Sequence, residues 1–335
     1  MPTYILGIES SCDDTSASVL CDGKVLSNLV ANQEIHKTYG GVVPELASRA
    51  HQQNIIPVVN QAISLANIDK NQLNAIAYTR GPGLLGSLLV GSSFSKSLSM
   101  GLRVPLIEVN HMQAHLLAHF IKDCNKKKPK FPFLGITISG GHTQIVLVKD
   151  YFEMQVIGET LDDAIGETFD KCGKMMGLSY PAGPIIDKNS KLGNSLKFVF
   201  TKPKVEGLNF SFSGLKTGFL RFIEKESKMK DDFISNEVNN LCASLQKTIV
   251  DILFEKITYA VKETGIKNIV FGGGVSCNTG IINKFNENKN DFKAFFPKFE
   301  YTTDNAAMIA MVGYLKYKKN DFSSIRKGAN ARYKI

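Results

Sequence analysis

The sequence predicts an α/β protein made of two related halves that face a cleft. With 335 residues, the chain is long enough for about two domains. An apolar strand, a polar turn and a second apolar strand occupy residues 6–20, and the same layout recurs at residues 134–148. In both halves a third strand follows, and later a strand that runs into a Gly-rich turn. This repeated order indicates a duplicated unit.

The strands are expected in the same order in each half. The first half has its third strand at residues 24–30 and its later strand at 74–79, before Gly81-Pro82-Gly83. In the second half the corresponding segments are 153–157 and 268–271, and the latter precedes Gly272-Gly273-Gly274.

Four helices are predicted from apolar spacing and end signals. Residues 236–264 carry the longest apolar stripe, and Gly265 ends it. The other three span residues 112–121, 163–176 and 304–317, and Asp304 is expected to be the N-cap of the last one.

Two segments connect or follow these elements. Residues 122–130 are rich in Lys and predict a loop between the halves, and residues 316–335 predict a basic surface tail. We therefore expect an N-terminal subdomain over 1–120 and a C-terminal subdomain over 121–304. Residues 305–335 are expected to pack back on the first subdomain.

Composition narrows the functional classes. Hydrophobic residues make up 43% and charged residues 21%, which excludes a disordered chain, a collagen-like chain and a small disulfide scaffold. The sequence contains no run of 18 apolar residues, so it predicts no membrane-spanning helix. Six scattered cysteines without a C-x-x-C pair favour a reducing, cytoplasmic location.

The charge is unevenly distributed along the chain. The net charge is +9, and the whole excess lies after residue 110, where 33 basic residues face 23 acidic ones. A basic half of this kind is compatible with a polyanionic partner such as a nucleic acid.

Two histidines at helical spacing form the first candidate site. His111 and His115 would lie one turn apart on one face of the helix at 112–121, where both can bind one metal ion. An ordinary His-rich face is the alternative, and His119 extends the stripe. Met112 follows His111, so this is not the H-E-x-x-H protease motif.

Gly-rich turns and carboxylates provide the remaining candidates. The turn 139–143 and the turn 272–278 bring backbone N–H groups close to any anion bound there, although a tight turn alone also explains them. Residues 162–170 contain four acids, and Cys12-Asp13-Asp14 places two carboxylates in the first hairpin turn. No nucleophile elbow of a serine hydrolase is present.

Taken together, these motifs resemble the TsaD family of bacterial tRNA threonylcarbamoyladenosine transferases, once described as glycoproteases. The resemblance covers residues 4–332 and is carried by the motifs at 9–15, 39–45, His111-x3-His115, 139–143, 210–216 and 272–276. It implies the actin/hexokinase/chaperone-ATPase fold. It also implies transfer of threonylcarbamoyl from threonylcarbamoyl-adenylate to the adenosine 3′ of the anticodon, in tRNAs that read codons beginning with A.

The resemblance also implies residue roles, a cofactor and partners. His111, His115 and Asp304 would hold one divalent metal, Fe(II) or Zn(II). Asp13 would act as base, and the family usually has Glu where Asp14 stands. The expected partners are TsaB and TsaE. The residues expected to line the adenylate site are Ile138, Ser139, Gly140, Gly141, His142, Asp170, Gly183, Asp187 and Asn278.

Three alternatives remain at this point. A metallopeptidase would use the His111/His115 pair but lacks a Glu base in that helix. A sugar-kinase-like ATP-dependent enzyme is allowed by the fold alone, and fold does not fix function. An inactive scaffold is disfavoured by the intact His, Asp and Gly motifs.

Overall fold

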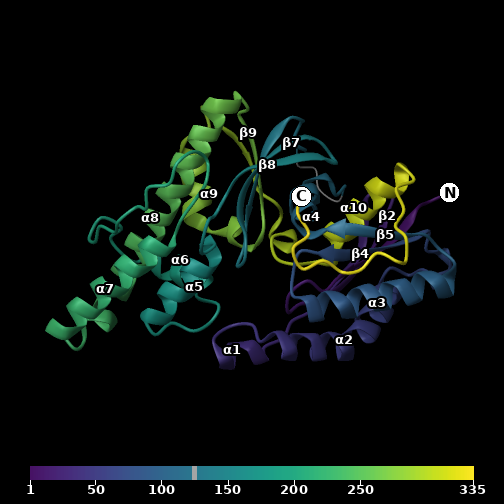
Figure 1. Ribbon diagram of the computed structural model, residues 1–335, viewed down its shortest axis with the longest axis horizontal. Coiled ribbons are helices and arrows are strands. Elements are labelled where there is room, and N and C mark those ends of the chain that lie inside the picture. Colours follow the sequence, from purple (N-terminus) through teal and green to yellow (C-terminus); the bar gives the residue numbers. More distant parts are fainter. Residues whose placement is uncertain (123–126) are drawn as a thin grey trace. The chain divides into compact units, whose positions relative to one another are not determined.

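The computed structural model describes residues 1–122 and 127–335, which form two units (Figure 1). Unit 1 comprises Met1–Pro129 and Pro297–Ile335, and unit 2 comprises Lys130–Phe296. The limits differ from the predicted 1–120 and 121–304. The chain returns to unit 1 directly after the last strand of the second sheet, so Asp304 belongs to unit 1.

Each unit contains one five-stranded mixed sheet. In unit 1 the strands are β1 (Tyr4–Glu9), β2 (Thr15–Cys21), β3 (Lys24–Ala31), β4 (Ala75–Gly81) and β5 (Leu106–Asn110). In unit 2 they are β6 (Phe133–Ile138), β7 (Thr143–Asp150), β8 (Glu153–Glu159), β9 (Asn268–Gly272) and β10 (Lys293–Phe295).

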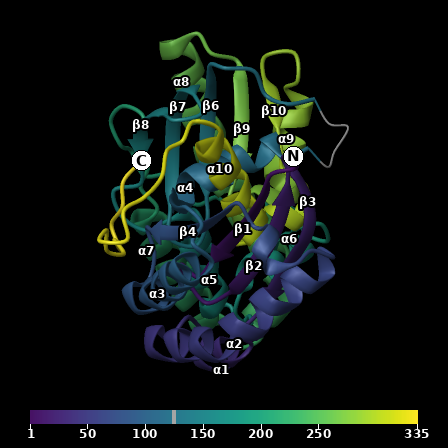
Figure 2. The ribbon, with the colours of Figure 1, turned by 90° about the vertical axis from the view of Figure 1, so that its right-hand side faces the viewer.

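The two sheets share one topology, which confirms the predicted duplication. Their orders are β3-β2-β1-β4-β5 and β8-β7-β6-β9-β10, and Figure 2 shows the second order from left to right. The hairpin register is also repeated, since Leu6 pairs with Val19 and Leu134 with Leu147, each 128 positions further on.

Helices cover both faces of the sheet in unit 1. They are α1 (Ile35–Tyr39), α2 (Pro44–Leu65), α3 (Leu85–Leu102), α4 (His111–Leu117) and α10 (Ala306–Lys318), with 3-10 turns η1 (Lys70–Gln72), η2 (Ala118–Phe120) and η4 (Phe299–Tyr301). Leu6 and Ile8 of β1 pack with apolar residues of α2 on one face. Gly7 faces α10 on the other, and Figure 1 shows the sheet between α10 and the α2/α3 pair.

Unit 2 has its own hydrophobic core. Its helices are α5 (Ile165–Met175), α6 (Ala182–Ser190), α7 (Ser213–Met229), α8 (Phe233–Thr264) and α9 (Thr279–Glu287), with the 3-10 turn η3 (Gly274–Cys277). Leu134, Ile136 and Phe271 of the sheet pack with buried residues of these helices, including Phe169 and Leu245.

Three predicted segments are corrected. The α-helix predicted at 112–121 ends at Leu117, where a 3-10 turn begins. The N-cap of α10 is Asn305, whose side chain accepts from the Met308 backbone N–H, so Asp304 is not the cap. The segment predicted as a surface tail begins inside α10, and its later part is bound to unit 1 through backbone contacts such as Asn330 N–H to Arg80 O.

Candidate metal centre and active site

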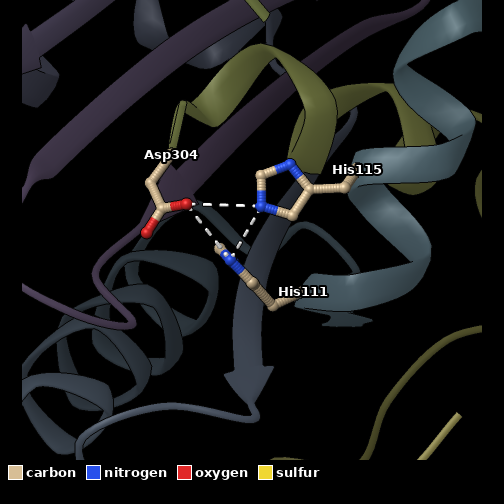
Figure 3. Close-up of side chains that lie close together, drawn as sticks. All are labelled: His111, His115 and Asp304. Atoms are coloured by element: carbon tan, nitrogen blue, oxygen red, sulfur yellow. Dashed lines mark hydrogen bonds and ion pairs between the residues drawn. The ribbon is translucent and has the colours of Figure 1, made fainter. Parts of the chain in front are cut away.

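His111 and His115 meet Asp304 within unit 1 (Figure 3). Asn110 begins α4 by accepting from the N–H groups of Met112 and Gln113, so His111 is the first helical residue and His115 follows one turn later. Asp304 lies directly before the N-cap of α10, and α10 packs against α4. Two helix starts thus place the three side chains together.

The three facing atoms lie at similar separations. Nε2 of His115 is 3.1 Å from Nε2 of His111, and Oδ1 of Asp304 is 3.3 Å from each of these nitrogens. Two ligands of a tetrahedral ion with bonds of about 2.0–2.1 Å lie about 3.3 Å apart. The cluster therefore fits a divalent metal without rearrangement of its side chains.

Burial and the neighbouring charges shift the pKa values of all three residues in the cluster. Burial tends to lower the pKa of His111, but the carboxylates of Asp304 and Glu9 outweigh it and hold that pKa well above its usual value. Burial lowers the pKa of His115. Burial tends to raise the pKa of Asp304, yet His111 lowers it overall. The charges of Asp304 and Glu9 therefore favour protonation of His111, whereas burial favours the neutral form of His115.

A residue that sequence reasoning missed supports His111 from behind. Glu9, at the end of β1, is fully buried, and its Oε2 lies 2.9 Å from Nδ1 of His111. The same oxygen accepts from the Thr79 hydroxyl. An acid that ends an otherwise apolar strand was the available signal in the sequence.

The predicted base lies in the turn between β1 and β2. His51 of α2 braces this turn, since its Nε2 is 3.0 Å from the Cys12 carbonyl and its Nδ1 is 2.7 Å from the Thr15 hydroxyl. Burial and the neighbouring carboxylates, chiefly Asp13, raise the pKa of Asp14 to about 7. A carboxyl that titrates near neutrality is suited to accept a proton, so Asp14 joins Asp13 as a candidate base.

In unit 2, the predicted adenylate-site segments follow two neighbouring parallel strands. The turn 138–142 follows β6, and Gly273 and Asn278 follow β9, which pairs with β6. The carboxyl ends of parallel strands are where α/β sheets bind ligands. A Cβ on Gly273 would lie 2.4 Å from the Ile138 carbonyl oxygen, so the two segments touch.

The glycines of this region are required for different structural reasons. Gly273 has a φ of 92°, which other residues rarely adopt. Gly140 and Gly141 have neither a positive φ nor any atom within 4 Å of an added Cβ, and beside Gly183 the nearest atom is 4.0 Å away. Neither backbone strain nor packing accounts for these three glycines, which is consistent with close approach of a ligand.

Hydrogen bonds from the first residues of α6 and α9 hold the two predicted carboxylates in place. The carboxylate of Asp170 accepts from the Ala182 N–H, next to Gly183. Asp187 accepts from both the backbone N–H and the hydroxyl of Thr279, next to Asn278. The structure therefore brings the predicted residues together in two pairs.

Solved structures with a similar fold define the fold class of the chain. HypF from T. kodakarensis superposes with a TM-score of 0.62 at 15% identity, over 95% of this chain and 48% of that one. Component A of the (R)-2-hydroxyglutaryl-CoA dehydratase of Acidaminococcus fermentans gives 0.53 at 15% identity, over 94% and 99%. Together with the duplicated sheets, these likenesses define an actin/hexokinase-like ATPase fold.

Sequence comparison gives the family. Residues 24–311 match the model of the TsaD family, tRNA N6-adenosine threonylcarbamoyltransferase. A protein of that name from Christiangramia forsetii is 62% identical over 99% of this chain and 98% of its own length. One from Riemerella anatipestifer is 60% identical over 99% and 98%. The chain belongs to the TsaD family. It is thus a transferase that acts on tRNA.

Proposed function

We propose that this chain transfers threonylcarbamoyl from threonylcarbamoyl-adenylate to N6 of the adenosine 3′ of the anticodon, in tRNAs that read codons beginning with A. Family membership gives transfer to adenosine N6 in tRNA. The donor, the position and the set of tRNAs are the proposal. The observation that carries it is the convergence of His111, His115 and Asp304 within the matched segment.

One divalent metal would be held by these three residues. Two imidazoles and one carboxylate suit Fe(II), the preferred candidate, and also Zn(II). At a site held by these residues, a bound ion would supply Lewis-acid polarisation of the acyl carbonyl. His111 and His115 are buried, and both direct a ring nitrogen toward Asp304.

Unit 2 would bind the adenylate. The turn Ile138, Ser139, Gly140, Gly141 and His142 has open space beside Gly140 and Gly141, where an anion could approach the backbone. Gly183 at the start of α6, with Asp170 of α5 beside it, and Asn278 at the start of α9, with Asp187 of α6 beside it, would approach the nucleoside.

The chemical step requires little beyond orientation and acceptance of one proton. The donor is a mixed anhydride, so the tRNA amine attacks its carbonyl, a C–N bond forms, and the C–O bond to the phosphate of AMP breaks. The proton released by the amine passes to a carboxylate, Asp13 in our proposal, with Asp14 as second candidate. No bond to the enzyme forms at any stage.

The experiment tests donor, acceptor and metal together. The protein is supplied with threonylcarbamoyl-adenylate and unmodified tRNA, and the nucleosides are analysed by mass spectrometry. We expect threonylcarbamoyladenosine, at a single position, only in tRNAs that read codons beginning with A. Casein, and ATP with a sugar, serve as control substrates. Cleavage of casein, or the absence of modified nucleoside with metal-loaded protein and both TsaB and TsaE present, would contradict the proposal.

Asp13→Asn and Asp14→Asn identify the base in the same assay. If Asp13 is the base, single-turnover rates fall by about 100-fold or more in Asp13→Asn. They fall far less in Asp14→Asn, provided both variants bind donor and tRNA as the parent does. The opposite ranking would assign the proton to Asp14.

We also propose TsaB and TsaE as partners in the reaction. Because tRNA is the acceptor, we expect the reaction to occur in the cytoplasm. This part rests on family membership. Among residues 1–122 and 127–335, no helix combines the length and apolar character needed to cross a bilayer. Strong multiple turnover by the isolated chain would contradict the need for partners.

A further inference from the structure

Glu9 receives three hydrogen-bond donors from three separate segments of unit 1. Its Oε2 lies 2.9 Å from Nδ1 of His111 and accepts from the Thr79 hydroxyl at 2.6 Å. Its Oε1 accepts from the Ser11 backbone N–H at 2.5 Å. The Glu9 side chain is wholly buried, and Thr79 and His111 are also buried. Water cannot easily replace any of these contacts.

The contact with His111 determines which ring nitrogen is free. A carboxylate only accepts, so Nδ1 of His111 must carry a proton to bond to it. In a neutral imidazole the other nitrogen, Nε2, then presents its lone pair, and Nε2 is the atom that faces Asp304 and His115. Metal-binding histidines commonly have such a carboxylate behind them.

The second oxygen extends this control to the first hairpin turn. Ser11 lies two residues before Asp13, and its carbonyl also accepts from the Leu84 N–H at 2.7 Å. The Ser11 hydroxyl lies 3.2 Å from Nδ1 of His111. One carboxylate therefore connects the helix that carries the metal ligands with the turn that carries the candidate bases.

We propose that Glu9 is a positioning residue: it holds a proton on Nδ1 of His111, so that Nε2 is the nitrogen that binds the metal, and it sets the place of the Ser11–Asp14 turn relative to α4. The inference rests on the proposed metal centre. A purely structural ion pair is the alternative. It predicts a loss of stability but no specific loss of metal affinity.

Glu9→Gln separates the two readings because glutamine keeps the size but has one acceptor and one donor group. The Ser11 backbone N–H can only donate, so the glutamine oxygen should face Ser11 and its amide N–H should face His111. Nδ1 then becomes the acceptor and the proton moves to Nε2, where it blocks the metal. We expect the affinity for Zn²⁺, measured by competition with a chelator, to fall 10- to 100-fold. Thr79→Val removes another donor to the same oxygen without touching His111, and should change the affinity by less than about threefold.

A spectroscopic measurement decides the case even if Glu9→Gln does not fold. In the Zn²⁺-loaded parent, ¹⁵N–¹H correlation spectra of histidine should show His111 protonated at Nδ1, with the signal assigned by its loss in His111→Gln. Protonation at Nε2 would overturn the inference.

The affinities separate this inference from the proposed function. A parent protein that binds neither Zn²⁺ nor Fe²⁺ would overturn the metal centre and, with it, the role of Glu9. A parent that binds Zn²⁺ no more tightly than a folded Glu9→Gln would overturn only the role of Glu9.

Discussion

Asp304 and Asn305 are adjacent residues with different tasks, and variants can separate them. Asn305 caps α10, while the Asp304 carboxylate faces His111 and His115. We predict that Asp304→Asn folds but loses most of its metal and activity, because an amide is a far weaker ligand than a carboxylate. Metal content by elemental analysis checks this.

The matched variant Asn305→Ala should behave in the opposite way. Loss of an N-cap side chain costs about 1 kcal/mol of stability, so its denaturation midpoint should fall while the metal stoichiometry stays at the parent level. Asn305→Ser, which can still cap, should match the parent in both measurements. Metal retained in Asp304→Asn would remove the carboxylate from the ligand set.

Cys12 tests whether the reaction proceeds without a covalent intermediate. Burial and the neighbouring Asp13 raise the pKa of its thiol, so little thiolate exists at neutral pH. We predict that Cys12→Ala keeps activity within a few-fold of the parent and that iodoacetamide modifies Cys12 slowly. A threonylcarbamoyl-cysteine detected by mass spectrometry of the parent would contradict this.

At the scale of elements, the contact between β1 and α10 depends on Gly7. A Cβ at this position would lie 2.4 Å from the Ala306 carbonyl oxygen and 2.6 Å from the Ala310 nitrogen, both of which are backbone atoms. Gly7→Ala should therefore force β1 and α10 apart and cost about 1–3 kcal/mol, as overpacking in a core does. Urea denaturation gives the value.

Gly101 provides the control for this substitution. It lies in α3, and nothing is within 4 Å of an added Cβ. Gly101→Ala should stabilise the protein by up to about 1 kcal/mol through helix propensity. If Gly7→Ala were as harmless as Gly101→Ala, the close packing of α10 on β1 would not matter for stability.

The same elements show which parts of the fold could be predicted from the sequence. The strand–turn–strand repeat was visible because side chains alternate between the two faces of a strand. The two copies therefore share both the apolar pattern and the hairpin register. The N-cap of α10 was misplaced because Asp and Asn are equally good caps and stand side by side. Tertiary contact decided between them: the Ala306 N–H donates to the Ser16 hydroxyl, from β2.

The site was predicted unevenly for a similar reason. His111 and His115 are visible because helical spacing places them on one face, and Asp304 came from the family resemblance. Apart from Ser11, two residues away, the contacts of Glu9 are with Thr79 and His111, and these are set by the strand order of the sheet. Only the fold shows that a lone acid in an apolar strand belongs to the site.

At the scale of the whole molecule, we expect the excess of basic residues to contribute to tRNA binding. Two basic segments contribute to this excess, the loop at 122–130 and the chain end. Residues 123–126, which include Lys126, lie outside the described residues, and Lys128 donates to the Phe120 carbonyl. The chain end is held in place by its backbone, because the Asn110 amide donates to the carbonyls of Tyr333 and Lys334.

This anchoring gives the exposed cations of the chain end a fixed position, and the last prediction follows from it. Arg326 and Lys334 are exposed. If both contact phosphates, Arg326→Gln/Lys334→Gln lowers tRNA affinity and reduces the slope of log affinity against log salt by about 1.4–1.8, at roughly 0.7–0.9 per phosphate. Lys24→Gln/Lys70→Gln removes the same charge from exposed positions elsewhere in unit 1, and should leave that slope unchanged. Binding titrations over a salt series provide both values. Equal slopes for the two double variants would mean that the chain end acts only through net charge, and the contact surface would then have to lie elsewhere.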